Sequence, residues 1–235
     1  MKILLWNCNN GMSKEAQISY FNSFQPDLAI IPELKEHNIS SLSPSSAIWA
    51  TNNHEKSKPK GLGVLGFNGV MLEQLETDGD MEIFLPIKVF AKEFSFNLPA
   101  VWNFYWACKQ GRFKNIIGEH ALEYEALRHY LPKLKAPLLI AGDWNLGPTF
   151  AQEYFFNICT MMRDYKIESL YHQFHNLHES KTNHATFRST SKTYHHLDHI
   201  FGSDFFQRKL KSIDIPKFED VKLSDHAPIS ADFDF

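Results

Sequence analysis

The segment PLLIAGDWN, residues 137–145, decides the fold class, because it joins a strand of the buried type to a polar turn. Its apolar run has the length of a strand and stops at Gly142. Asp143 and Asn145 follow, and they would point to the same side if the chain stayed extended. In α/β proteins, the residues just past the carboxyl end of such a strand usually carry the chemistry. The alternative is an ordinary tight turn, in which Asp and Asn are both common.

A similar strand end occurs near the start of the chain. Residues 2–6 form a short apolar strand that also breaks at Trp-Asn, here Trp6-Asn7. Residues 13–24 are typical of an amphipathic helix that Ser13 can cap. Residues 28–31 form a second buried strand, which ends at Pro32-Glu33. Strand, helix and strand in succession indicate a βαβ-like unit, with Asn7 and Glu33 at neighbouring strand ends.

The remainder of the chain is rich in predicted strands. Residues 37–60 are polar and are expected to be a loop, whereas Asn68-Gly69 between two apolar runs is a strong hairpin signal. Consecutive hairpins require antiparallel pairing, so the βαβ-like unit must belong to a mixed sheet. The predicted strands are 61–67, 70–75, 82–90, 94–102, 186–188, 197–201, 212–215 and 227–233, and the further helices are 116–134 and 148–165.

Composition indicates one soluble domain over residues 1–235, with 43% apolar and 22% charged residues. The net charge is -3 and the pI about 6.4, so the chain lacks the basic excess of proteins that bind nucleic acid over a broad face. Binding to phosphate would need a local patch, a metal or a small footprint. The 3 cysteines show no CxxC spacing, and no apolar run reaches membrane-spanning length. We therefore expect a cytoplasmic protein with no membrane association and no obligate protein partner.

Polar residues cluster at five of the predicted strand boundaries, and together they describe a carboxylate-rich site with one histidine. These residues are Asn7, Glu33, Asp143 with Asn145, Asp198, and Asp225 with His226. Each alone would be an ordinary solvated or turn residue. A second histidine-rich stretch, with His172, His175 and His178 spaced by three, is conceivable as a metal site. No other nearby ligand completes it, so we assign no metal there.

The order of these motifs resembles the endonuclease/exonuclease/phosphatase superfamily, which includes exonuclease III and DNase I. The resemblance rests on WN at 6–7, PELK at 32–35, GDWN at 142–145, LDHIF at 197–201 and SDHAPI at 224–229. Residues 169–198 also look like a bacterial branch of that family with few characterised activities. The resemblance implies a four-layer α/β/β/α sandwich, in which two mixed β-sheets pack face to face with flanking helices. It also implies a Mg²⁺-dependent phosphodiester hydrolase, in the first place a nuclease acting on DNA or RNA.

The resemblance makes Glu33 the main metal ligand, supported by Asn7 and by Asp225, for which the alternative is a second structural acid. Mg²⁺ prefers hard oxygen ligands and keeps several waters, so one or two carboxylates suffice to hold it. Mn²⁺ is the alternative ion. The metal would polarise a phosphate oxygen and offset the charge that builds up in the transition state.

By the same resemblance, Asp143 activates water or protonates the leaving group, and Asn145 orients the phosphate or the water. His226 corresponds to the histidine on the phosphate side. Asp198 would be its partner, fixing the tautomer and supporting an imidazolium.

The substrate is less well specified. Asn9 stands where several DNA-repair members have Asp, and Trp102 stands near the place of a family tyrosine. Aromatic and basic residues alternate between 102 and 114, which can form a stacking and phosphate-contacting surface or a core beside solvated cations. The expected substrate-binding residues are Asn9, Trp102, Tyr105, Trp106, Arg112 and His196. The alternatives are a small phosphorylated molecule or lipid headgroup as substrate, and a non-catalytic binding module on the same fold.

Overall fold

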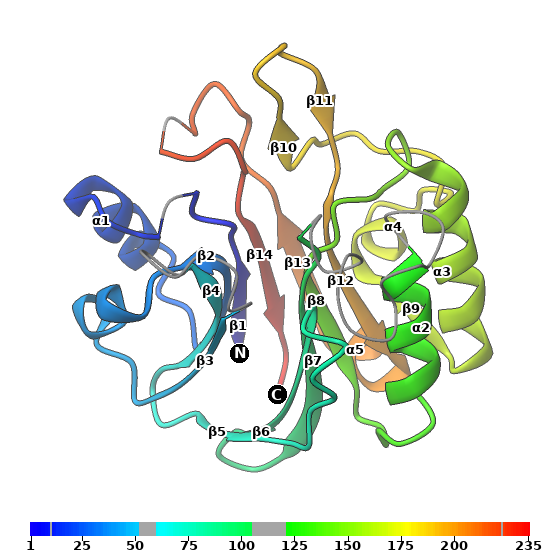
Figure 1. Cartoon of the computed structure of the whole chain (residues 1–235), viewed down its shortest axis with the longest axis horizontal. Coiled ribbons are helices and arrows are strands. Elements are labelled where there is room, and N and C mark those ends of the chain that lie inside the picture. The colour runs from blue at the N-terminus through cyan, green and yellow to red at the C-terminus, as the bar shows by residue number, and fades with distance from the viewer. Residues whose placement is uncertain (10, 52–59, 105–120, 222) are drawn as a thin grey trace.

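Two six-stranded mixed sheets form the centre of the computed structural model, which describes residues 1–9, 11–51, 60–104, 121–221 and 223–235 (Figure 1). In spatial order, the first sheet contains β13 (Leu210–Asp214), β14 (Ile229–Phe233), β1 (Lys2–Leu5), β2 (Leu28–Leu34), β4 (Gly61–Gly66) and β3 (Ser46–Thr51). The second contains β5 (Met71–Gln74), β6 (Phe84–Phe90), β7 (Ser95–Trp102), β8 (Leu139–Asp143), β12 (Asp198–Ser203) and β9 (Ile167–Ser169). A two-stranded hairpin of β10 (Phe187–Arg188) and β11 (Tyr194–His195) stands apart from both sheets.

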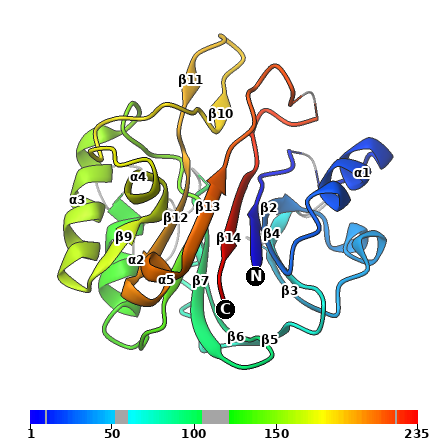
Figure 2. The same cartoon turned by 180° about the vertical axis from the view of Figure 1, so that it is seen from behind.

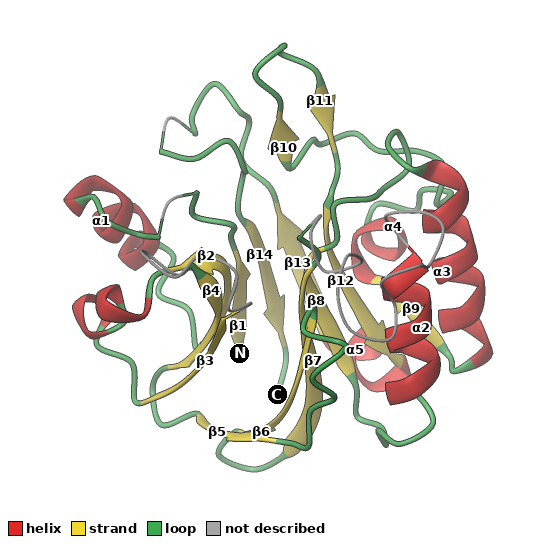
Figure 3. Ribbon diagram, viewed as in Figure 1, coloured by secondary structure: helices red, strands yellow, loops and turns green. Residues whose placement is uncertain are grey.

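Helices cover the outer faces of both sheets, as the red ribbons of Figure 3 show. On the first sheet lie α1 (Glu15–Ser23) and the short 3-10 helices η1 (Glu36–Asn38) and η2 (Ser40–Leu42). On the second lie α2 (Ala121–Tyr130), α3 (Gln152–Asp164) and α4 (Leu170–Phe174), and α5 (Asp204–Lys209) follows β12. This arrangement confirms the four-layer α/β/β/α sandwich. None of the helices in the described ranges is both long and apolar enough to span a bilayer.

The alternation of side chains along β1 shows how the layers are held together. Ile3 and Leu5 join the apolar core between the two sheets, which also includes Ile87 of β6. Leu4 and Trp6 point the other way and pack in the second apolar cluster, with Phe21 of α1. All six side chains are buried, and full burial of one apolar side chain of this kind stabilises the fold by about 1.5–3 kcal/mol.

The pairing of the central strands brings the predicted strand ends together. β1 pairs with β2 in parallel, which confirms the βαβ-like unit, and β2 pairs with β4 antiparallel, so the sheet is mixed as expected. In the second sheet, β8 pairs with β7 in parallel and with β12 antiparallel. Asp143 at the end of β8 is therefore opposite both Trp102 and Asp198.

The predicted hairpin at Asn68-Gly69 is wrong. A tight turn does occur there, since the N–H of Val70 donates to the carbonyl of Phe67 at 2.9 Å. However, β4 pairs with β2 and β3, whereas β5 pairs with β6 in the other sheet. The turn therefore connects the two sheets, because β4 belongs to the first sheet and β5 to the second. A local sequence signal for a turn carries no information about such distant partners.

Three local boundaries also differ from the sequence-based expectations. Residues 46–51, expected to be loop, form the edge strand β3, whose half-buried side chains lack a clear apolar pattern. Helix α1 begins at Glu15 after Lys14, whose N–H donates to Oε1 of Gln17 at 3.2 Å, so Ser13 is not the cap. Strand β2 runs past Ile31 to Leu34 through a shift in register, so that Glu33 lies within the strand rather than after it.

Candidate active site

Three buried groups from three different segments converge at one end of the sandwich. Asp143 ends β8, Asp198 begins β12, and His226 lies just before β14. One ligand atom of each lies within 4.8 Å of the others, and this is the only such group of acidic, histidine or cysteine side chains among the described residues. Figures 1 and 2 show these strand ends on the side of the molecule from which the β10–β11 hairpin projects.

His226 is held in a single orientation by its neighbours. Its Nδ1 lies 2.8 Å from Oδ2 of Asp198, and its backbone carbonyl accepts a hydrogen bond from Nε1 of Trp6 at 3.0 Å. Its backbone N–H donates to Oγ of Ser224, which in turn donates to the carbonyl of Asn7. Burial by itself lowers the pKa of His226, but the charges of Asp198 and Asp143 prevail and raise the pKa to about 10. The ring is therefore an imidazolium at neutral pH.

Asp143 carries the carboxyl group at the centre of the site. Its Oδ2 accepts from Nδ2 of Asn7 at 3.0 Å, and its Oδ1 accepts from the backbone N–H of Asn145 at 3.0 Å. Burial is the main cause, followed by the nearby charge of Asp198, and together they raise the pKa of Asp143 to about 7. A carboxyl group with that pKa can take up or release a proton near neutral pH.

The chain does not stay extended between Asp143 and Asn145. Asn145 adopts a left-handed conformation with φ 49°, and its N–H closes a turn onto the Asp143 side chain. The backbone therefore forms the tight turn that was the alternative prediction for this segment, and the side chains of Asp143 and Asn145 lie beside each other in it. Nδ2 of Asn145 donates to the carbonyl of Asn103 at 2.6 Å, which fixes the carboxamide beside Asp143.

Glu33 joins the same network from the first sheet. Nδ2 of Asn7 lies 3.3 Å from Oε1 of Glu33 and also donates to Asp143, so it bridges the two carboxylates. The other oxygen, Oε2, lies 2.6 Å from Nζ of Lys60. Glu33 has φ 61°, at the register shift that extends β2.

The donor set fits a divalent cation. Carboxylate oxygens of Asp143 and Asp198 lie close together, and Asn7 links Glu33 to Asp143. Oδ1 of Asp198 is buried with no hydrogen-bond partner. A buried carboxylate oxygen in this state is costly unless a cation or a bound water satisfies it. Asp225, the third expected metal ligand, is half-buried, and its Oδ1 lies 3.4 Å from Oγ of Ser224. It does not belong to the Asp143, Asp198 and His226 group.

Sequence reasoning missed two residues that hold the site in place. Asn103 donates its N–H to the carbonyl of Asp143 at 2.8 Å and accepts from Asn145. Thr186 accepts the N–H of Asp198 at 3.0 Å through Oγ1 and thereby fixes the start of β12. Asn103 directly follows Trp102 at the end of β7, so it repeats the Trp-Asn strand-end signal of the other two segments.

The expected substrate-binding residues have mixed outcomes. Asn9 is half-buried, and its N–H donates to Oδ1 of Asn7 at 3.1 Å, which places it beside the site. Trp102 is only 8% exposed and packs against Phe104, with 5.0 Å between ring centroids. The other assignments in this stretch, Tyr105, Trp106 and Arg112, lie outside the described residues.

The assignment of His196 to substrate binding is wrong, because its side chain is fully buried. Its Nδ1 lies 2.8 Å from the carbonyl of His184, and its ring packs against those of Tyr171 and His199. Burial lowers the pKa of His196 to about 3, so the ring is neutral. It belongs to the core beneath α4 and not to a surface that a substrate could reach.

The histidines spaced by three do not form a metal site in the described structure. Nδ1 of His172 lies 2.7 Å from Oγ of Ser169, and burial lowers the pKa of His172 to about 4. His175 and His178 are more exposed, and none of the three belongs to a group with metal-binding geometry among the described residues.

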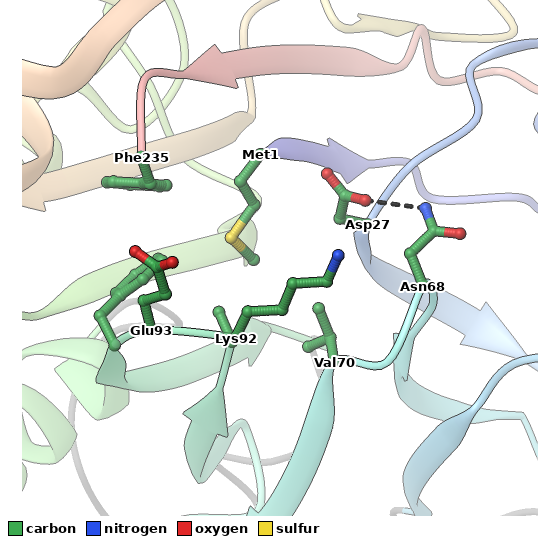
Figure 4. Close-up of a pocket in the computed structure, with 9 residues that line it drawn as sticks. Met1, Asp27, Asn68, Val70, Lys92, Glu93 and Phe235 are labelled. Atoms are coloured by element: carbon green, nitrogen blue, oxygen red, sulfur yellow. Dashed lines mark hydrogen bonds between the residues drawn. The ribbon is translucent and has the colours of Figure 1, made fainter.

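Two cavities lie away from the candidate site. One, of about 290 Å³, is near the chain termini and is drawn in Figure 4, where Asn68 donates to Asp27 at its rim. The other, of about 450 Å³, lies beside α3 and α4 and is lined in part by His172 and Arg163. Neither is lined by Asp143, Asp198 or His226.

Comparison with known proteins identifies the fold. No family model matches the sequence, and no curated protein matches it significantly. Among solved structures, the 3' phosphatase NExo from Neisseria, bound to a product DNA hairpin, matches with a TM-score of 0.67 and 15% identity over 100% of both chains. An AP endonuclease from Archaeoglobus fulgidus matches with a TM-score of 0.69 and 13% identity, again over 100% of both chains. An endonuclease/exonuclease/phosphatase family protein from Leptotrichia buccalis gives 0.66 and 14% over the same full coverage. The chain therefore has the DNase I-like fold of that superfamily, as its motifs led us to expect.

Proposed function

We propose that this protein is a divalent-metal-dependent hydrolase of phosphate esters, and that its substrate is a phosphodiester of DNA or RNA. The observation that carries the proposal is the buried Asp143, Asp198 and His226 group, linked through Asn7 to Glu33 at one end of a DNase I-like sandwich. Proteins that share this fold include a 3' phosphatase solved with a DNA product and an AP endonuclease.

A metal at this site would be held by Glu33 and Asn7, with Asp225 as a third candidate. The oxygen-rich donor set favours Mg²⁺, with Mn²⁺ as the alternative, because both ions prefer carboxylate, carbonyl and water ligands. When bound, the ion would polarise a phosphate oxygen and offset negative charge in the transition state.

Three side chains of the protein would carry out the remaining steps of the reaction. Asp143 in its ionised form accepts a proton from the attacking water, and its pKa of about 7 leaves much of it ionised near neutral pH. The Asn145 carboxamide, fixed by Asn103, orients the water or the phosphate. His226 has Nδ1 committed to Asp198, so Nε2 is the nitrogen that donates to a phosphate oxygen. Fixed donors aimed at developing charge are a large source of rate acceleration in enzymes.

The test measures hydrolysis of single- and double-stranded DNA, RNA and phosphomonoesters, with EDTA and with added Mg²⁺ or Mn²⁺. We expect metal-dependent cleavage of a nucleic acid that falls at least about 100-fold in Asp143→Asn and in His226→Ala. His37→Ala, a change of an exposed histidine, is the matched control and should retain full activity. Cleavage that persists in Asp143→Asn and His226→Ala, or that needs no metal, would overturn the assignment.

A small phosphorylated molecule or a lipid headgroup is the second candidate substrate. The net charge of -3, without a basic excess, favours it, because a broad nucleic-acid footprint normally depends on Lys and Arg. Hydrolysis of the phosphomonoesters in preference to DNA and RNA in the same assay would select this candidate.

A further inference from the structure

A row of rings leads from the buried His226 to the surface of the protein. The ring of Phe187 lies 4.9 Å from that of His226, and the ring of Phe150 lies 5.4 Å from that of His195. Phe187 and His195 are directly opposite each other in the β10–β11 hairpin. Exposure increases along the row, from 4% at His226, through half-buried Phe187 and His195, to 45% at Phe150.

The hairpin places its two rings on one face. Residues directly opposite in an antiparallel pair project to the same side, so Phe187 and His195 form a cross-strand pair. The base of the hairpin is tied to the site by backbone bonds: Arg188 N–H donates to the carbonyl of Asp225 at 2.9 Å, and Ala227 N–H donates to that of Thr186 at 2.8 Å. Its position relative to His226 is therefore fixed, and it projects beyond the sheets in Figures 1 and 2.

Phe150 reaches the same face from the loop after β8. This loop begins at Asp143 and closes in a turn, where Gly147 N–H donates to the carbonyl of Phe150 at 2.7 Å. A Cβ atom on Gly147 would lie 1.9 Å from the carbonyl oxygen of His196, so only glycine allows the loop to approach the hairpin this closely. Oγ1 of Thr149 lies 3.2 Å from Nδ1 of His195 and fixes the edge of that ring.

We propose that His195 and Phe150 form a stacking platform for a nucleobase next to the phosphate bound at His226. The proposal rests on the proposed function and names the part of a nucleic-acid substrate that this rim recognises. The two rings are partly exposed, are held by separate elements at the edge of the site and are tilted by 58° to each other, so each offers a ring face on which a base can stack. Stacking also supplies affinity that a chain of net charge -3 does not obtain from a broad basic surface.

The first experiment removes the base from the substrate and the ring from the protein in turn. A base-less tetrahydrofuran nucleotide is moved stepwise through a single-stranded oligonucleotide, and KM and kcat are measured for wild type, Phe150→Ala and His195→Ala. For wild type, one position next to the cleaved bond should raise KM about 5- to 100-fold when its base is missing. In the two variants KM should already be raised by a similar factor for the intact oligonucleotide, with no further loss for the base-less one.

Matched controls separate stacking from structure. Phe174→Ala removes another exposed Phe, the last residue of α4, whose ring lies 5.2 Å from that of His175, and it should leave KM unchanged. Phe150→Trp, unlike Phe150→Ala, should keep the low KM of wild type, because a larger ring preserves the stacking surface. Equal KM values for wild type and Phe150→Ala on every substrate would overturn the platform.

A binding measurement distinguishes this proposal from the proposed function. The Asp143→Asn variant is titrated against an oligonucleotide that carries 2-aminopurine, whose fluorescence reports stacking. Fluorescence quenching that is lost in Asp143→Asn/Phe150→Ala supports the platform, even if wild type cleaves no nucleic acid and the proposed function fails. Cleavage without any effect of the base overturns the platform and leaves the proposed function intact. Absence of both binding and cleavage overturns both.

Discussion

The Nδ1 atom of His226 lies 2.8 Å from Oδ2 of Asp198, and both side chains are buried. Asp198→Asn removes the charge that most strongly favours the imidazolium, so the pKa of His226 should fall and kcat should decrease about 100-fold or more. A pH titration of the His226 ring by NMR, together with kcat at pH 7, checks both effects. Asp204→Asn, which changes an exposed acid on α5, should alter neither. An unchanged ring pKa in Asp198→Asn would contradict the pairing.

Lys60 should compete with a metal ion for Glu33, because its Nζ lies 2.6 Å from Oε2 of that residue. Lys60→Met removes this partly exposed ion pair, which is worth about 1 kcal/mol or less. Apparent Mg²⁺ affinity should therefore tighten, by up to about fivefold. Calorimetric titration of Mg²⁺ measures the change, and Glu33→Gln should weaken binding in the same assay. Weaker Mg²⁺ binding in Lys60→Met would show that Lys60 supports the site instead.

The buried His172 should make the protein less stable in acid. Burial lowers the pKa of His172 from 6.5 to about 4, so the unfolded chain binds more protons than the folded chain between these values. The contribution of the neutral His172 to the free energy of unfolding is fully present above pH 6.5 and is lost as pH falls toward 4. Over a similar pH range Asp143 has the opposite effect on stability, because burial and the charge of Asp198 raise its pKa in the folded state. Comparison with a variant is therefore needed to isolate the histidine.

The comparison uses His172→Gln. Urea unfolding midpoints at pH 7.5 and pH 5 should differ less in this variant than in wild type, because one group that gains a proton on unfolding is gone. His37→Gln, on an exposed residue, should reproduce the wild-type difference. An undiminished pH dependence in His172→Gln would mean that His172 is not held neutral by the fold.

Gly142 should tolerate no side chain. A Cβ at this position would lie 1.8 Å from the carbonyl oxygen of Val101 on the neighbouring strand β7. Gly142→Ala should therefore lower the free energy of unfolding by about 2 kcal/mol or more and displace Asp143. Gly79→Ala is the control, because nothing lies within 4 Å of a Cβ there. Thermal unfolding of both variants gives the comparison, and equal melting temperatures would refute the close approach.

Residues 137–145 illustrate what local sequence can establish. The apolar run predicts a buried strand, and the structure contains β8 at Leu139–Asp143. The same reasoning succeeds at residues 2–6 and 28–31, because a strand buried on both faces must be apolar at every position. It fails at Ser46–Thr51, because the edge strand β3 is half-buried and its residues do not show a clear apolar pattern. The same reasoning did not predict α5 or β9, because both are too short to show a hydrophobic periodicity.

The candidate site shows a different limit. The motif order identifies Asp143, Asp198 and His226 as candidates, and they lie within 4.8 Å of one another. His196 has the same residue type and lies only two positions from Asp198, yet it is fully buried. Residue type and spacing do not distinguish a ring that faces the site from one that packs against Tyr171.

The sequence by itself determined the buried strands and the polar residues at their ends. A strand that is shielded from water on both faces requires apolar residues, and the turn that follows it requires polar ones, so both requirements are local. The tertiary structure alone decided which strands pair, and therefore that Asn68-Gly69 crosses between sheets and that Asp143 lies opposite Asp198. It also decided the charge states, since the pKa of Asp143 depends on burial and on a carboxylate 55 positions away in the chain. Both outcomes depend on contacts between distant segments, and the free energy of those contacts is set only when the two sheets pack together.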